Sequence, residues 1–517
     1  MNDVNQGLLT FLAIITLTVV PASNLHADDD DIFDSVRNLV EQAFGVDAAV
    51  EAVNAVVRGE NAGGALPGEK DINEYRSRLQ DYSQAMQHWL TVMCPLSEAE
   101  QNAVKEFVDA EILKSTKAFA EAPDGDRQQQ IFPVTFPMVF TLKAANRAGR
   151  QSATDFSERV MLSIRTDVLN AEQQARVDMA LKERDDFQRL AFIEYLVAQS
   201  DDELFLTTAQ RQEVSTALAD RKPSISHPLY LFNAQSYYLP YESMSGILSN
   251  ASVGKILDNR QKKRLLDLNN ADPNSQHIIF QSSAGRDGWY VQMNEAGLKE
   301  RQKFLNAAAV RVAYYEKELS LSAEQAEFLT SASKGAAVRA VNDWKESTEQ
   351  TFESMEQQMA QMGGDFGFGA SSMDLRTIEN NQIWKDALST CNTKLVYAAE
   401  KLRKAALRQA TGNSVLALMD NELWLLPEQR TSLLPLIVKS LPDNSSPFQY
   451  QEYIREVVLI AHPLFLVREK SRDEILDVSQ QNVWKTLQGF FQLQKENNYV
   501  QIQLRNNGAS FGFMLAP

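Results

Sequence analysis

The sequence DDELFLTTAQR at 201–211 returns as DNELWLLPEQR at 420–430. A second stretch follows each copy, ILDNRQKKRL at 256–265 and ILDVSQQNVW at 475–484. Both matches keep the offset that places Asp201 on Asp420, with no insertion between them, and we call it the repeat offset. Two unrelated amphipathic helices would not keep two such anchors at one offset, whereas a duplicated unit does. We therefore expect a mainly α-helical protein made of two related multi-helix halves.

A shorter pattern predicts where helices begin. A Leu is followed by a residue that can accept a hydrogen bond and, three residues later, by Glu or Gln, which is the sequence of a capping box. One copy departs from it, because Leu426 stands at the cap position, but Pro427 suits the first residue of a helix. The copies are LSEAE at 96–100, LNAEQ at 169–173, LTTAQ at 206–210, LDNRQ at 257–261, LSAEQ at 321–325, LLPEQ at 425–429 and LDVSQ at 476–480. We interpret these residues as helix caps and not as catalytic groups.

The chain divides into seven segments on this basis. The 517 residues are long for one hydrophobic core, which favours more than one domain. Proline-bearing stretches such as 221–232 and 440–450 are expected to be turns between helices. The expected segments are a signal peptide at 1–27, an N-terminal helix at 28–58, a linker at 59–70, helical half 1 at 71–272, a hairpin-like connector at 273–297, helical half 2 at 298–495 and a hairpin-like tail at 496–517.

The N-terminus predicts export. An apolar run from Leu8 to Val20 precedes small residues and LHA at 25–27, as in a secretory signal cleaved near Ala27 or Ala22. The run is shorter than the roughly 20 residues that a membrane-spanning helix needs, and the later sequence offers no comparable stretch. We expect a periplasmic or secreted protein with no stable membrane insertion.

Two places suggest short strands. HIIFQ at 277–281 and WYVQM at 289–293 flank a glycine-bearing turn, and YVQIQL at 499–504 and FGFML at 511–515 flank another. Each half is therefore expected to close with a small β-hairpin. The stretch GGDFGFGASS at 363–372 is expected to be an exposed loop, with docking of a partner as the alternative.

Composition excludes some functions. The net charge of −17 repels phosphate backbones and anionic membrane surfaces, so nucleic-acid binding is not expected. The 44% hydrophobic content is enough for a packed interior. A basic face on the helix before 410 comprises Lys394, Lys401, Arg403, Lys404 and Arg408. We expect it to be solvated or paired with the acidic remainder.

The motifs that resemble catalytic signatures lack their context. GASFG around Ser510 resembles a nucleophile elbow, but the chain ends five residues after Gly512 and no His follows. DFG at 365–367 has no glycine-rich loop or catalytic loop to accompany it. We therefore predict no catalytic, cofactor-binding or metal-binding residues and no cofactor.

Histidines and cysteines give no metal-ligand spacing. The histidines His88, His227, His277 and His462 are scattered, and we interpret His227 and His462 as turn residues. Export would permit a disulfide between Cys94 and Cys391, with two separate buried thiols as the favoured alternative.

Two resemblances rest on these motifs. CPLSEAEQ at 94–101, LTTAQRQEV at 206–214 with its proline turn, and ILDNRQ at 256–261 resemble large, uncharacterised secreted helical proteins of planctomycete-type bacteria. That resemblance covers most of 90–490 and implies a location and a fold, but no reaction. The LTxxQ pattern is also similar to periplasmic stress proteins of the Spy and CpxP kind, which implies a chaperone role.

The leading hypothesis is an exported, non-enzymatic protein of the cell envelope with a structural or protein-interaction role and an unidentified protein partner. The alternatives are a periplasmic chaperone or stress sensor, and a hydrolase with an unrecognised site between the halves.

Overall fold

The computed structural model describes residues 69–121, 156–220, 251–269, 277–281, 285–360, 367–371, 377–391, 393–441, 462–489, 491–496, 499–504 and 510–514. The expected signal peptide, N-terminal helix and linker lie outside the described residues, apart from the last two positions of the linker, as do the stretches 221–232 and 442–450. The chain forms two compact units, one of 1–70 and 118–129 and one of 71–117 and 130–517. The following description concerns the second unit.

The protein is mainly α-helical, as expected. The first predicted half contains α4 (Glu69–Met93), α5 (Glu98–Glu121), α8 (Ala171–Leu204), α9 (Thr208–Ala217), α11 (Ala251–Ile256) and α12 (Asn259–Asn269). Residues 156–167 are also helical. The later helices are α13 (Gly285–Glu318), α14 (Ala323–Ala360), α15 (Thr377–Asn380), α16 (Gln382–Ser389), α17 (Thr393–Leu423), α18 (Pro427–Ser440), α20 (Glu469–Asp473) and α21 (Val478–Gly489).

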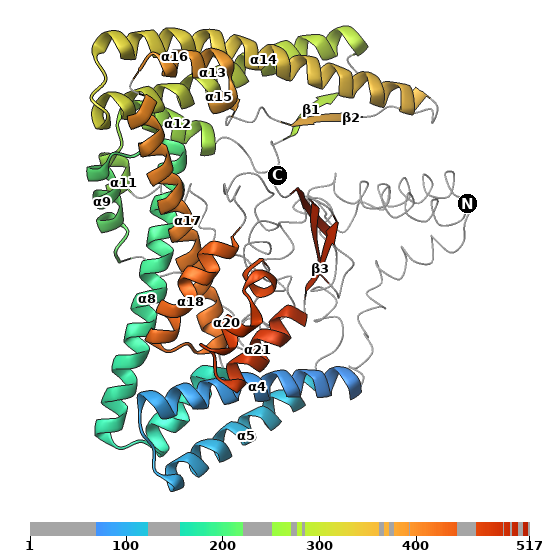
Figure 1. Ribbon diagram of the computed structural model, residues 1–517. Coiled ribbons are helices and arrows are strands. Elements are labelled where there is room, and N and C mark those ends of the chain that lie inside the picture. Colours follow the sequence, from blue (N-terminus) through green and yellow to red (C-terminus); the bar gives the residue numbers. More distant parts are fainter. Residues whose placement is uncertain are drawn as a thin grey trace, which may run out of the picture. The chain divides into compact units, whose positions relative to one another are not determined.

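Two long helices lie side by side in this unit. The helices α8 and α17 are far apart in the sequence, yet they pack along much of their length (Figure 1). They run antiparallel, because Arg184 near the middle of α8 contacts Asp420 at the end of α17, while Arg403 of α17 contacts Asp201 at the end of α8. All the paired features described below are arranged about this helix pair.

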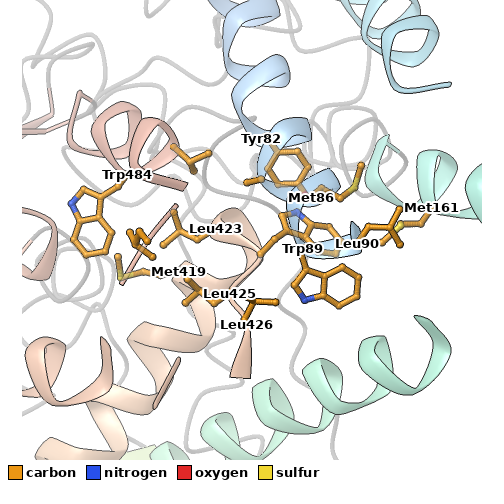
Figure 2. Packing of buried hydrophobic residues seen from close by; sticks show 14 of the residues in the cluster. Tyr82, Met86, Trp89, Leu90, Met161, Met419, Leu423, Leu425, Leu426 and Trp484 are labelled. Carbon is orange, nitrogen blue, oxygen red and sulfur yellow. The ribbon is translucent and has the colours of Figure 1, made fainter. Parts of the chain in front are cut away.

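The hydrophobic cores combine residues from both predicted halves. The largest cluster joins α4, α5 and the start of α8 to α17, α18 and α21 (Figure 2). In that cluster, Trp89 of α4 contacts Trp424 with ring centroids 5.3 Å apart. A second cluster joins Phe205, which follows α8, to α13, α14 and α16. A third lies among α8, α9, α11 and α12. Neither half therefore buries its apolar faces entirely within itself.

The connector at 273–297 corrects the sequence prediction. The strand β1 (His277–Gln281) exists, but it pairs antiparallel with β2 (Gly367–Ser371), and 289–293 lies inside α13. The buried residues there are Trp289, Met293 and Ala296. Their spacing of four and then three residues is that of a helix face. The prediction of a strand at 289–293 was therefore wrong.

The glycine stretch at 363–372 also differs from expectation. Its residues 367–371 form β2 instead of an irregular loop. Strand pairing is a backbone interaction, so a sequence without branched side chains can still satisfy its N–H and C=O groups in this way. Residues 363–366 and 372 lie outside the described residues.

The C-terminal strands follow the last helix. The strands β3 (Phe491–Glu496), β4 (Tyr499–Leu504) and β5 (Ser510–Met514) form an antiparallel sheet in the order β3-β4-β5. The helical part of the second half therefore ends at Gly489, before the boundary at 495 that the sequence suggested. The register pairs Ile502 with Phe511.

Candidate functional site: two matched glutamine clusters

The capping-box prediction is confirmed at the helix starts. At the start of α9, Thr207 Oγ1 accepts from the Gln210 N–H at 3.2 Å, and the Thr207 N–H donates to Gln210 Oε1 at 3.0 Å. The same reciprocal bonds occur at the pairs Ser97–Glu100, Asn170–Gln173, Asp258–Gln261, Ser322–Gln325 and Asp477–Gln480. Leu426 makes only the backbone half of the motif, by donating its N–H to Gln429 Oε1 at 2.9 Å.

Two of these caps are joined by their glutamines. The amides of Gln210 and Gln261 donate to each other's carbonyl oxygens, at 2.8 and 3.0 Å. Gln210 Nε2 also donates to the Ile256 carbonyl at 3.0 Å, and Gln261 Nε2 donates to the Leu204 carbonyl at 3.2 Å. We call these residues the first glutamine cluster. It fixes the end of α8 and the starts of α9 and α12 to one another.

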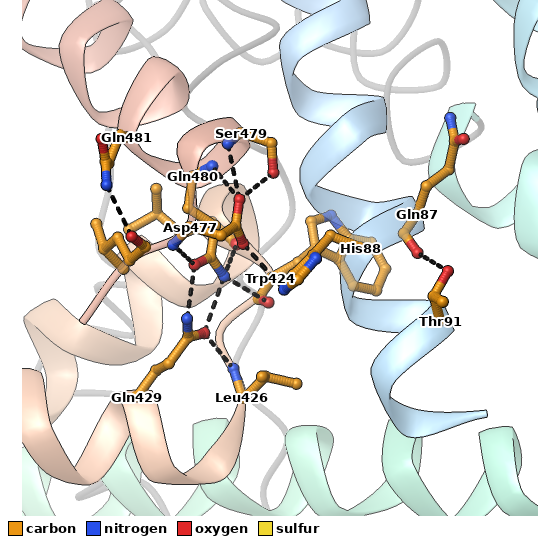
Figure 3. A network of polar contacts seen from close by, with 12 residues as sticks. Gln87, His88, Thr91, Trp424, Leu426, Gln429, Asp477, Ser479, Gln480 and Gln481 are labelled. Atoms are coloured by element: carbon orange, nitrogen blue, oxygen red, sulfur yellow. Dashed lines mark hydrogen bonds and ion pairs between the residues drawn. The ribbon is translucent and has the colours of Figure 1, made fainter. Parts of the chain in front are cut away.

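The second glutamine cluster reproduces these contacts at the repeat offset (Figure 3). Gln429 and Gln480 exchange bonds at 2.8 and 2.9 Å. Gln429 Nε2 donates to the Ile475 carbonyl at 2.9 Å, and Gln480 Nε2 donates to the Leu423 carbonyl at 3.0 Å. Gln480 is fully buried, so its amide depends on these partners for its hydrogen bonds.

Each glutamine cluster lies beside a buried aspartate that contacts an arginine of the other half, and Asp201 also pairs with Arg211 of its own half at 3.1 Å. Arg184 of α8 donates through Nε to Asp420 Oδ2 at 3.0 Å and through Nη2 to the Asp420 carbonyl at 2.6 Å. Arg403 of α17 donates through Nε to Asp201 Oδ2 at 3.2 Å and through Nη2 to the Asp201 carbonyl. The repeat offset places Arg184 on Arg403, so the two contacts are equivalent and crossed.

The same arginines cover two aromatic residues of unusual backbone conformation. Phe205 and Trp424 both have φ of 51°, in the left-handed region that bulky residues rarely adopt. The Arg403 guanidinium lies 3.6 Å from the Phe205 ring centroid, and that of Arg184 lies 4.0 Å from the Trp424 ring centroid. Cation–π contacts of this kind help to hold the strained turn after each helix.

A basic residue from the other half also reaches each capping aspartate. Lys317 Nζ of α13 lies 3.2 Å from Asp258 Oδ2, and His88 Nε2 of α4 lies 3.3 Å from Asp477 Oδ2. Burial alone would raise the pKa of Asp258. The hydrogen bond from the Gln261 N–H and the contact with Lys317 outweigh that effect and hold the Asp258 pKa below its ordinary value of 3.8.

One contact joins two residues that are themselves related by the repeat offset. Asn413 Nδ2 of α17 donates to Glu194 Oε2 of α8 at 2.7 Å. In an arrangement with a local twofold axis, equivalent residues meet each other only on the axis. The crossed arginines lie on either side of this contact along both helices.

A small hollow lies beside the first glutamine cluster. It is lined by Phe205, Gln210, Asp258, Gln261 and Lys317, among others, and leaves no volume for a water molecule. In the described part of the chain, no group of three or more His, Cys, Asp or Glu side chains is arranged to hold a metal ion. The two clusters can stabilise a helix junction, and the hollow beside the first is too small for a substrate.

The residues singled out from the sequence lie apart from one another. Cys94 and Cys391 are both buried free thiols, and burial raises the pKa of each. His462 is buried at the start of a helical stretch, and burial lowers its pKa. His88 lies in α4 and His277 in β1, while His227 lies outside the described residues.

The basic face of α17 divides into two groups. Arg403 contacts Asp201, and Arg408 donates through Nε to the Val438 carbonyl at 2.9 Å. Lys394, Lys401 and Lys404 are exposed. The three lysines are solvated and Arg403 contacts a carboxylate, as expected, while Arg408 bonds to backbone carbonyls.

Arg184 and Glu194 were not identified from the sequence. The two matching stretches of sequence begin at Asp201 and Asp420. The equivalent contacts begin upstream of them, with Arg184 and Arg403. Extending the comparison at the repeat offset into the preceding helices would have paired these arginines, although neither lies in a recognisable motif.

Comparison with known protein families, with curated proteins and with solved structures finds no match. Among the described residues, the structure contains no helix with the length and apolar character that crossing a bilayer requires.

Proposed function

We propose that this chain is an exported, non-enzymatic protein of the cell envelope with a structural or protein-interaction role, built from two copies of one helical unit. The observation that carries the proposal is the crossed pair of arginine–aspartate contacts, Arg184 to Asp420 and Arg403 to Asp201. In both contacts, the buried ionic groups join α8 to α17. This joining of helices explains why the charges are buried and supports a structural role for them.

The geometry around α8 and α17 supports the duplication. The arginines, the two glutamine clusters and the left-handed aromatic residues all match at the repeat offset. Equivalent contacts on both sides of the Glu194–Asn413 pair are what an isologous, twofold interface between two copies produces.

The two units depend on each other in this proposal. Asp420 is fully buried and Asp201 is 5% exposed, and each receives a guanidinium from the opposite copy. A buried carboxylate without its partner costs several kcal/mol. The pair is therefore better described as an intramolecular dimer than as two linked domains, and such a helical body suits a scaffold.

The export part of the proposal rests on the sequence from Leu8 to Ala27. The acidic composition suits a protein that remains in solution outside the cytoplasm. The resemblance to secreted helical proteins points to the same location. Cell fractionation tests this part, since a protein found only with the cytosol would contradict it.

The experiment that tests the interaction role is a pull-down with the mature protein from its own envelope extract, followed by mass spectrometry of the retained proteins. One dominant partner at a fixed stoichiometry is the expected result. A broad set of unfolded proteins would favour the chaperone alternative instead. No retained protein would contradict the interaction role, and the hydrolase alternative would then require a search for small molecules bound between the copies.

A further inference from the structure

One exposed face of α17 carries an apolar row. Its members are Leu395, Ala398, Leu402 and Ala405, all solvent-exposed. They follow one another at spacings of three, four and three residues, so they lie along one side of the helix. Leu402 is 71% exposed and Leu395 is 46% exposed. We call these four residues the α17 row.

Lysines accompany the α17 row along its length. Lys394, Lys401 and Lys404 are exposed, and none of them forms an ion pair with another described residue. Tyr397, which is 68% exposed, lies among them. The net charge of the chain is −17, and among the described residues these three neighbouring cations have no ionic partner. They form a local site that attracts carboxylates.

The helix α8 provides an internal comparison. The repeat offset places the α17 row on Arg176, Met179, Glu183 and Asp186, which we call the α8 row. Its charged members all have ionic partners: Arg176 pairs with Glu172 at 2.6 Å, Asp186 with Arg189 at 3.0 Å, and Glu183 with Arg430. The charged members of the α8 row are therefore all paired, and Glu183 reaches the buried Arg430 of α18.

The contrast between the rows argues that the α17 row is covered by another molecule. The two helices share contacts at the repeat offset, with Arg184 matching Arg403 and Asp201 matching Asp420. One contact differs, because Arg430 pairs with Glu183 whereas its counterpart Arg211 pairs with Asp201. Both rows are at the surface, yet one carries paired charges and the other carries leucines and alanines. An apolar stripe at helical spacing beside like charges is typical of a surface that receives an amphipathic helix.

We propose that the α17 row, flanked by Lys394, Lys401 and Lys404, docks a helix of another protein whose apolar stripe is bordered by Asp or Glu. This proposal rests on the protein-interaction role proposed above and names the surface and the partner's chemistry. The leucines contact the partner's stripe, and the lysines pair with its carboxylates. Ala398 and Ala405 allow the partner's backbone to approach closely, because helix–helix distances depend on the side chains at the contact.

A membrane surface is the other class of partner that a basic, apolar helix can meet, and two features disfavour it. Interfacial helices bury bulky residues such as Trp, Phe and Leu in the lipid, whereas half of the α17 row is alanine. The overall charge of −17 also repels anionic lipids. Anionic vesicles are therefore included in the test as a contradicting outcome.

The test measures binding of a designed peptide to the full-length mature chain by fluorescence anisotropy. The probe is a labelled helical peptide of roughly 20 residues, long enough to be helical, with a Leu/Ala stripe bordered by Glu. A second peptide carries Lys in place of each Glu. The key variant combines Leu395→Arg with Leu402→Glu, the residues that α8 holds at the equivalent positions. The matched control is Met179→Glu, an exposed substitution in the α8 row.

We expect the acidic peptide to bind the wild-type chain and Met179→Glu equally, and to bind the double variant at least about tenfold more weakly, which corresponds to about 1.4 kcal/mol. Raising the salt to about 1 M should weaken binding, because it screens the lysines. Circular dichroism should show the same helix content in all variants. Equal binding of the Lys peptide, equal binding to the double variant, or binding of anionic phospholipid vesicles in place of the peptide would overturn the docking surface.

The same double variant separates this inference from the proposed function. If the envelope pull-down retains one stoichiometric partner with both the wild type and the double variant, the interaction role stands. The proposal that the α17 row is the docking surface is then contradicted. If the wild type retains none, the proposed function itself fails.

Discussion

At the scale of single residues, Arg184 and Arg403 make equivalent contacts at opposite ends of the α8–α17 pair. Each guanidinium lies over the ring of an aromatic residue whose backbone is in the left-handed region. It also donates to both the carboxylate and the carbonyl of a buried aspartate. Arg184 and Arg403 are themselves only 11% and 10% exposed. Their charges are therefore screened little by solvent. Removal of Arg184 takes away the ion pair of Asp420, whereas Asp201 keeps Arg211 at 3.1 Å when Arg403 is removed.

We predict that Arg184→Leu lowers the free energy of unfolding by about 3 kcal/mol. Arg403→Leu should cost less, about 2 kcal/mol, because Asp201 keeps its contact with Arg211 at 3.1 Å. Urea denaturation followed by circular dichroism measures both. The control is Arg176→Leu, whose exposed ion pair with Glu172 should be worth less than about 1 kcal/mol. A large loss at one buried arginine and none at the other would contradict the equivalence.

Asp258 gives a prediction for pH. Its pKa is lower in the folded protein than its ordinary value of 3.8, so it favours folding above that value. This contribution is lost as the pH falls from 3.8 through the lower folded pKa. Asp258→Asn keeps a good helix cap but removes the charge, so it should lower the melting temperature at neutral pH.

The difference in melting temperature between wild type and Asp258→Asn should shrink as the pH falls below 3.8. The wild-type carboxyl then becomes neutral, as the Asn side chain already is. Thermal unfolding followed from about pH 2.5 to about pH 7 gives the curve. Lys317→Met, which removes the facing cation, should reduce the same pH dependence. A difference that stays constant across the range would show that the charge of Asp258 does not contribute.

At the scale of elements, most helix starts are set by local sequence, and α18 is the informative exception. Leu426 lacks a side-chain acceptor, and the α18 start relies on Pro427 and on the bond from the Leu426 N–H to Gln429. Leu426 is 7% exposed and belongs to the largest core cluster. Tertiary packing has therefore replaced one capping bond with a buried side chain.

We predict that Leu426→Thr destabilises the protein even though it restores the cap. A new cap contributes about 1 kcal/mol, whereas removing a buried Leu side chain costs about 2 kcal/mol or more. The net loss in urea denaturation should be at least about 1 kcal/mol. Thr207→Ala at the matched start of α9 should also lose about 1 kcal/mol, from the cap alone. An increase in stability for Leu426→Thr would mean that capping outweighs packing there.

At the scale of the whole molecule, the cores and the crossed contacts join residues of both predicted halves. Trp89 of α4 packs on Trp424, and Tyr314 of α13 packs on Phe205 with ring centroids 5.8 Å apart. Together with the helix pair α8 and α17, these contacts join each predicted half to the repeated stretch of the other, at 201–211 or 420–430.

We predict that the halves stay together when the chain between them is cut. A specific protease site inserted between Asp272 and Ser275 should give two fragments that elute as one species at the size of the intact chain. The physical reason is the burial of Asp201 and Asp420 against arginines of the other half. Adding Arg184→Leu and Arg403→Leu to the cut chain should promote dissociation. Fragments of the otherwise unmodified chain that separate in buffer would show that each half folds alone.

The sequence predicted the local elements better than their partners. Capping boxes such as Thr207–Gln210 depend on neighbours three residues apart, so they could be identified directly. The strand β1 was also recognised, but its partner β2 lies far along the chain in a glycine stretch with little strand propensity. The helix at 289–293 was missed because Trp, Tyr and Val favour strands, while burial of Trp289 and Met293 on one helix face decided the outcome.

The sequence by itself determined the helix starts, the helical class and the match at the repeat offset, because these depend on residues close together or on direct comparison of letters. Only the tertiary structure decided that Arg184 neutralises Asp420, that Arg403 neutralises Asp201, and that the lysines and leucines of α17 remain at the surface. The physical reason is that a charge or an apolar side chain acquires its role from what buries it. That environment is supplied here by helices from the distant half of the sequence.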